Sequence, residues 1–113
     1  MTFEEATAKA LAFRDERNWV QFHNPKDLAI SLNLEAAELL ELFQWSGADL
    51  SVSDPKKREH MAEELADVAI YCIYLADVLG VNLADAISGK INANKQKYPV
   101  EKSRDCAKKY TEL

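Results

Sequence analysis

Glycine, proline and cysteine are scarce in this chain. Its 113 residues include three glycines, three prolines and two cysteines, whereas 48% of them are hydrophobic. This composition excludes a loop-rich or disordered protein and favours a compact all-helical domain. The cysteines, Cys72 and Cys106, lack the spacing of metal ligands, and we interpret them as reduced thiols of a cytoplasmic protein.

Positive charge and long hydrophobic runs are scarce as well. The net charge of −5 argues against a nucleic-acid polymer as partner, because such binding depends largely on Lys and Arg neutralising phosphates. A single nucleotide stays possible, since a metal can bridge its phosphates to acidic residues. No apolar run approaches the ~20 residues that span a bilayer, and the N-terminal segment lacks a signal-peptide pattern. We therefore expect a cytoplasmic protein with no membrane partner.

Capping signals divide the chain into four expected helices. A capping box opens the first helix, Asn24 and Asp54 each cap a helix ahead of a proline, and Gly80 is a natural C-terminal stop. Apolar residues recur between these signals at helical spacing. The expected helices cover residues 2–17, 25–45, 55–79 and 82–97.

These helices predict an all-α fold of the four-helix bundle type over residues 1–99. The second and third helices are apolar around most of their circumference, which is more than a four-helix monomer can cover. We therefore expect homo-oligomerisation to complete the bundle. Residues 100–113 form a charged C-terminal tail that is either loosely held or contains a short further helix.

A pair of acidic motifs interrupts the two apolar helices. Glu35-x-x-Glu38 and Glu64-x-x-Asp67 each place two carboxylates on one helix face, because residues three apart share a face. Carboxylates are almost never buried without compensation, and the second helix has no Lys or Arg beyond its first turn. Four converging acids with oxygen ligands therefore predict a Mg²⁺ site.

Other interpretations of these acids stay open. A solvated helix edge, or pairing with Lys and Arg across the bundle, is favoured for Glu41 and Glu63. It fits Glu35 poorly, since leucines lie one turn before and after it. A di-iron carboxylate bundle would need Glu-x-x-His on two helices, and His23 and His60 both lie outside such motifs.

Candidate substrate contacts lie outside the acidic motifs. The apolar face of the fourth helix continues into Asn94 and Lys97, which would present an amide and a cation to the acids; a frayed, solvated helix end is the alternative. Trp19 and Trp45 bracket the second helix, with His23 nearby. Aromatic rings commonly hold a nucleobase by stacking, although core packing is the alternative for each residue taken alone.

Four sequence blocks together resemble a known family. ERNWVQFHNP, ExxExxELFQW, EELADV and NKQKYP resemble, in this order, the MazG-like all-α nucleoside triphosphate pyrophosphohydrolases, and most closely the dCTP pyrophosphatase branch. The resemblance covers about residues 10–99. It implies a Mg²⁺-dependent dimer or tetramer that converts a dNTP, either dCTP or a related or modified pyrimidine, to dNMP and pyrophosphate. Its role would be nucleotide-pool cleansing.

The resemblance also implies roles for individual residues. The metal ligands and catalytic carboxylates would be Glu35, Glu38, Glu64 and Asp67. The contacts to substrate phosphate or sugar would be Asn94, Lys97 and Tyr98, and the base pocket would include Trp19, His23 and Trp45. A non-catalytic oligomeric helical binding module and a phosphohydrolase releasing orthophosphate are the alternative functions.

Overall fold

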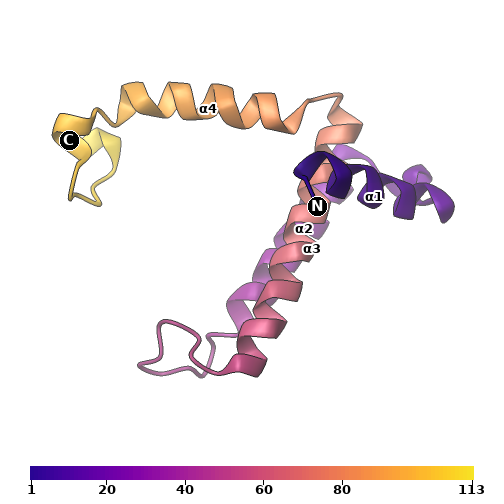
Figure 1. The fold of residues 1–113 in the computed structure, drawn as a ribbon, viewed down its shortest axis with the longest axis horizontal. Coiled ribbons are helices and arrows are strands. Elements are labelled where there is room, and N and C mark those ends of the chain that lie inside the picture. Colours follow the sequence, from indigo (N-terminus) through magenta and orange to yellow (C-terminus); the bar gives the residue numbers. More distant parts are fainter. The chain divides into compact units, whose positions relative to one another are not determined.

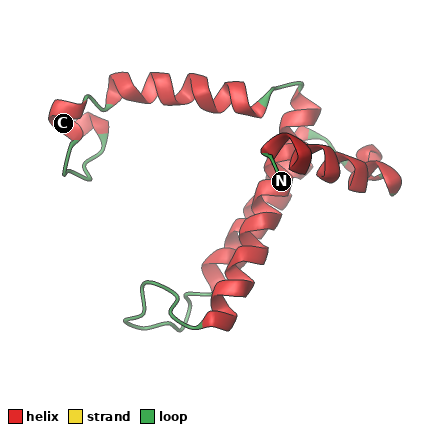
Figure 2. Ribbon diagram, in the orientation of Figure 1, coloured by secondary structure: helices red, strands yellow, loops and turns green.

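The computed structural model describes residues 1–113, which fold into helices and loops without any strand (Figures 1 and 2). The predicted all-α class is thus confirmed. The elements in chain order are α1 (Phe3–Glu16), η1 (Trp19–Phe22), α2 (Pro25–Glu41), α3 (Pro55–Leu79), α4 (Leu83–Lys97), α5 (Val100–Ser103) and η2 (Tyr110–Glu112). They divide into two compact units, Met1–Gly80 and Val81–Leu113.

Side-chain caps set where the four long helices begin. Thr2 and Glu5 form a reciprocal capping box at the start of α1. Asn24 and Asp54 accept hydrogen bonds from backbone N–H groups in the first turns of α2 and α3, and Asn82 does the same for α4. The four helices begin within one residue of the expected positions, so the predicted helix starts are confirmed.

The predicted end of α2 is wrong by four residues. The helix was expected to reach Trp45, but it ends at Glu41. Beyond it the chain tightens into three-residue turns, in which the N–H groups of Phe43 and Gln44 donate to the carbonyls of Leu40 and Glu41. Such tightening of a last turn is common and leaves no mark in a hydrophobic pattern.

In the first unit, α2 and α3 run antiparallel and pack along their length, and α1 packs on α3 (Figure 1). The core centres on Leu28 of α2 with Ile73 and Tyr74 of α3, all nearly inaccessible to water. Ala10 and Leu11 of α1 pack against this cluster. The core therefore lies at the end of the α2–α3 pair that is near α1.

Much apolar surface stays accessible on these helices. Leu34 and Leu40 of α2 and Leu65 of α3 are exposed, as are Trp45 and Leu50 beyond α2.

No single helix is long and apolar enough to cross a membrane, whereas α3 and α4 reach that length and composition as a bent pair.

A hydrogen-bonded loop joins α2 to α3. The Asp49 carboxylate accepts hydrogen bonds from the backbone N–H groups and hydroxyls of both Ser51 and Ser53. Between these serines, Val52 is buried with φ at 54°, a left-handed conformation that is costly for a β-branched residue. The Asp49 bonds thus hold the loop in a strained turn.

The second unit contains α4 and the segment that follows it. Helix α5 is the short further helix that was one of two expectations for the tail. After α5 the chain reverses, and η2 returns beside the end of α4 (Figure 1).

Candidate active site

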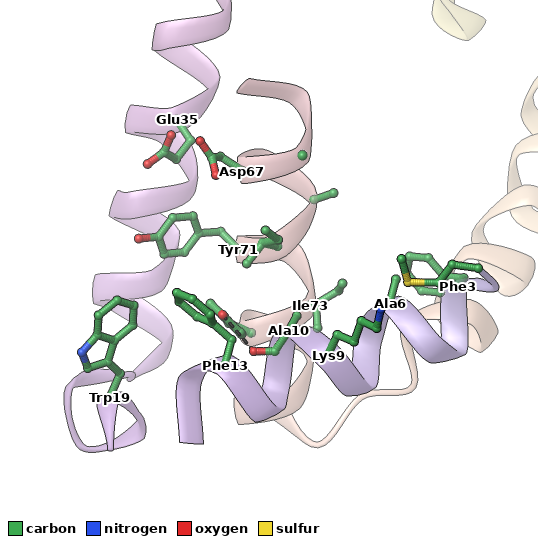
Figure 3. Close-up of a pocket in the computed structure, with 15 residues that line it drawn as sticks. Phe3, Ala6, Lys9, Ala10, Phe13, Trp19, Glu35, Asp67, Tyr71 and Ile73 are labelled. Atoms are coloured by element: carbon green, nitrogen blue, oxygen red, sulfur yellow. Dashed lines mark hydrogen bonds between the residues drawn. The ribbon is translucent and has the colours of Figure 1, made fainter. Parts of the chain in front are cut away.

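Three carboxylates from α2 and α3 converge in the first unit. Glu35, Glu64 and Asp67 each offer an oxygen within 4.8 Å of the oxygens offered by the other two. Glu35 and Asp67 point toward each other across the gap between the two helices (Figure 3). The spacing of three residues between Glu64 and Asp67 puts both on the face of α3 that meets α2. Both acidic motifs therefore contribute to one cluster.

Two oxygens of this cluster are buried without any hydrogen-bond partner. They are Oε2 of Glu35 and Oε2 of Glu64. An unpartnered buried acceptor is costly, and more so when it belongs to an ionised group. A divalent cation with hard oxygen ligands would satisfy both atoms, and carboxylate oxygens are the protein ligands that Mg²⁺ takes. The residues present therefore fit a divalent metal ion.

The crowding of carboxylates changes their acidity. The pKa of Glu35 is raised, first by burial and then by the negative charges of Glu38 and Asp67. The pKa of Glu38 is raised as well, chiefly through a hydrogen bond shared with the Glu64 carboxyl and through the charge of Glu64. Like charges held this close favour proton or cation uptake.

Glu38 takes a different place from the other three acids. It is exposed, and it lies outside the group of three whose oxygens are mutually close. Glu41 and Glu63 are also exposed, in agreement with the solvated edge favoured for them.

His60 joins the cluster, although it was not among the predicted site residues. Its Nε2 lies 3.0 Å from Oε1 of Glu64, one helical turn further on. The Glu64 carboxylate, 13% exposed, thus has one oxygen held by His60 and the other free for a ligand. The spacing of four residues before an acidic motif is the signal that would have indicated this contact.

A cavity of about 610 Å³ extends from the acids along α1. Glu35 and Asp67 line one part of it, Tyr71 follows, and Phe13 and Trp19 lie beyond (Figure 3). The volume is within the range of small-molecule sites, which are mostly apolar with a few polar groups. The cavity therefore combines an acidic region with an aromatic one.

Edge-to-face contacts order the aromatic region. The rings of Phe13 and Trp19 are 5.6 Å apart at 76°, and the Arg17 guanidinium lies 3.7 Å from the centre of the Phe13 ring. The rings of Tyr71 and Tyr74 are 6.0 Å apart at 89°. Phe13 and Tyr71 were not among the predicted site residues, although Tyr71 follows Asp67 by one helical turn.

His23 lies behind this cavity. Its ring is 5.1 Å from that of Tyr74, and its Nδ1 is buried without a hydrogen-bond partner. Burial and the charge of Arg14 lower the pKa of His23. Trp19 therefore lines the cavity, and His23 packs against Tyr74, which also lines it. Trp45 is 88% exposed and does not line the cavity of its own chain.

The three residues predicted to contact phosphate or sugar belong to the second unit. The Tyr98 N–H donates to the Asn94 carbonyl at 2.8 Å, which places Asn94 one turn before Tyr98 at the end of α4. Asn94 is half-buried, whereas Lys97 and Tyr98 are exposed.

The chain belongs to the MazG-like family, whose sequence model matches residues 30–113. It is 44% identical over 115 aligned positions to dCTP pyrophosphatase 1 of Rattus norvegicus and 38% identical to dCTP pyrophosphatase 1 of Homo sapiens. Each alignment covers 99% of this chain and 68% of the relative. The family to which the sequence blocks pointed is therefore confirmed.

Proposed function

We propose that this protein is a Mg²⁺-dependent nucleoside triphosphate pyrophosphatase that converts a dNTP to dNMP and pyrophosphate. The decisive observation is an acidic cluster in which two buried carboxylate oxygens have no hydrogen-bond partner. This cluster borders a cavity that is lined by aromatic side chains. The relatives named dCTP pyrophosphatase 1 support the reaction and favour dCTP or a related or modified pyrimidine as substrate. The corresponding role is nucleotide-pool cleansing.

The acidic residues of the cluster would bind the metal ion. Glu35, Glu38, Glu64 and Asp67 would hold the metal ion, and Glu35, Glu64 and Asp67 are the three whose oxygens lie within 4.8 Å of one another. A bound Mg²⁺ supplies charge neutralisation at the phosphates and lowers the pKa of a coordinated water. Hydrolysis forms a bond from the water oxygen to the α-phosphorus and breaks the bond to the β-phosphate oxygen, so pyrophosphate leaves.

The cavity supplies the binding of the nucleoside. Phe13, Trp19 and Tyr71 offer ring faces and edges on which a base can pack while water is excluded. Stacking on one aromatic ring contributes about 1–3 kcal/mol per base. Asn94, Lys97 and Tyr98 would contact the phosphates or the sugar, because an amide, an ammonium and a phenol are suitable donors to them.

The protein would also self-associate through its exposed apolar side chains. Five large apolar side chains are each more than half exposed, namely Leu34, Leu40, Trp45, Leu50 and Leu65. A dimer or tetramer would bury this surface, complete a four-helix bundle and give Trp45 a partner for base binding. We place the protein in the cytoplasm, with no nucleic-acid polymer or membrane as partner.

The test is hydrolysis of a panel of dNTPs and NTPs with and without Mg²⁺, with the products separated by ion chromatography. We expect pyrophosphate release that needs Mg²⁺, ranks dCTP or a related pyrimidine first, and is lost in Glu64→Gln. The neighbouring Glu63→Gln removes the same charge from an exposed position and should retain turnover. Orthophosphate as product would indicate a stepwise phosphohydrolase, and no turnover by a folded oligomer would indicate a binding module.

A further inference from the structure

The ring of Tyr110 contacts two residues at the end of α4. The Lys97 ammonium lies over this ring, with Nζ 4.8 Å from the ring centre. The ring of Tyr98 meets it edge-on, with centroids 5.9 Å apart at 81°. Both partners are residues that the proposed function assigns to the substrate, whereas Tyr110 lies in the segment that the sequence indicated only as a tail.

The intervening chain is folded so that Tyr110 returns to α4 (Figure 1). The N–H groups of Lys102 and Ser103 donate to the Pro99 carbonyl, which starts the short α5 directly after Tyr98. The chain then reverses at Asp105, whose φ of 59° is in the left-handed region that Asp tolerates better than most residues. The short helix and the reversal lie between α4 and Tyr110, whose ring lies against Lys97 and Tyr98.

Lys97 is otherwise unrestrained. No carboxylate lies within ion-pair distance of its ammonium, and the side chain is exposed. A free lysine side chain samples many rotamers, and a phosphate that binds it must stop that motion. An aromatic face under the ammonium restricts the motion before any ligand arrives, without neutralising the positive charge.

We propose that Tyr110 is a positioning residue that orders Lys97 and Tyr98 for the substrate phosphates. The inference rests on the proposed function, since phosphate contact by Lys97 is part of it. The C-terminal segment therefore contributes to substrate binding indirectly. Tyr110 does not touch the reacting atoms, and it acts by ordering Lys97 and Tyr98.

Steady-state kinetics on dCTP test the proposal. Tyr110→Leu removes the ring and should raise KM roughly two- to five-fold, the range that an exposed cation–π contact supports, while leaving kcat near the wild-type value. Tyr110→Phe keeps the ring and should restore the wild-type KM. Lys108→Met removes one exposed charge from the same segment and serves as the matched control, with no change expected in KM.

A double-mutant cycle shows whether Tyr110 acts through Lys97. In a Lys97→Met background the further change Tyr110→Leu should add less than two-fold to KM, because the cation is already gone. Full additivity of the two effects, or a Tyr110→Phe variant as impaired as Tyr110→Leu, would overturn the proposal. A fall in kcat at unchanged KM would also contradict it, since the contact concerns binding.

A measurement without turnover separates this inference from the proposed function. The ε-methylene protons of Lys97 should show an upfield ring-current shift in NMR spectra of the wild type and of Tyr110→Phe, but not of Tyr110→Leu. Titration with Mg²⁺ and inorganic pyrophosphate should move these signals, with affinity two- to five-fold weaker in Tyr110→Leu. If no triphosphate is hydrolysed but pyrophosphate moves the Lys97 signals and binds more weakly to Tyr110→Leu, the proposed function is wrong and the role of Tyr110 stands. If the signals stay still, or the affinities are equal, the role of Tyr110 fails.

Discussion

Arg14 of α1 and Asp77 of α3, far apart in the sequence, form an ion pair with Nη1 and Oδ2 at 2.6 Å. Arg14 is the one buried charged residue of the chain, at 6% exposure, and its Nε also donates to Asp15. Near this pair the Tyr74 hydroxyl donates to the Ala10 carbonyl at 2.9 Å. These contacts hold α1 against α3 and so set the wall of the cavity formed by Phe13 and Trp19.

Breaking this pair should loosen α1. Asp77→Ala leaves a buried guanidinium with only Asp15, and we expect a loss of about 1–3 kcal/mol in the free energy of unfolding. The estimate lies below the range for fully buried pairs because the Asp77 side chain is 42% exposed. Urea unfolding measures the loss. Glu16→Ala, which breaks the exposed Arg17–Glu16 pair, should cost less than about 0.5 kcal/mol, and equal losses in both variants would contradict this account.

Metal binding should be visible as thermal stabilisation. Mg²⁺ at ten times its dissociation constant should add about 1.4 kcal/mol to the stability of the wild type, because only the folded chain assembles the carboxylates. Glu64→Gln should abolish this increment, and the exposed Glu63→Gln should keep it. Differential scanning calorimetry with Mg²⁺ or EDTA gives the comparison. A Mg²⁺ effect that survives in Glu64→Gln would place the ion elsewhere.

In EDTA the stability should fall as pH rises above about 4.5. The folded-state pKa of Glu35 lies above its ordinary value of 4.5, so the folded chain keeps a proton that the unfolded chain has released. This contribution of Glu35 to the free energy of unfolding is fully present below pH 4.5, and it is lost as the pH rises through the raised pKa. Glu35→Gln should remove that part of the slope in urea titrations across this range. A slope unchanged in the variant would show that Glu35 does not titrate in this way.

His60 should influence metal affinity without being indispensable. Removing a side chain that orients a metal ligand typically weakens binding 10- to 100-fold, and we expect the lower end for His60→Ala because His60 is exposed. His60→Gln can still donate to Glu64 and should recover part of the affinity. The Mg²⁺ concentration for half-maximal turnover is the measurement, and Lys57→Ala on the same helix is the control. Equal effects of His60→Ala and Lys57→Ala would show that the hydrogen bond to Glu64 has no role.

The sequence allowed the helices and the acidic cluster to be predicted because both depend on local rules. Caps at Asn24 and Asp54 mark helix starts within a residue, and a spacing of three places Glu64 and Asp67 on one face whatever surrounds them. The family resemblance assigned Glu35, Glu38, Glu64 and Asp67, and the oxygens of Glu35, Glu64 and Asp67 lie close together. The placement of each motif on one helix face needed no knowledge of how distant segments pack.

What escaped prediction depends on tertiary packing. The Arg14–Asp77 pair, the contact between Tyr110 and Lys97 and the cavity wall at Phe13 each join segments whose meeting no periodicity reveals. Trp45 was assigned to the base pocket from its place next to α2 and from the family resemblance, and within its own chain its side chain is exposed.

The strained loop between α2 and α3 has a consequence for altering the length of the chain. Because the loop lies beyond the end of α2 and before Asp54, residues added at the exposed Leu50 would leave both acidic motifs in register. One residue inserted between Asp67 and Ile73 would instead turn Glu64 and Asp67 by about 100° around the helix axis relative to the core residues Ile73 and Tyr74, away from Glu35. The α2–α3 loop can therefore change length while the acids stay in register, whereas the middle of α3 admits substitution but no change of length.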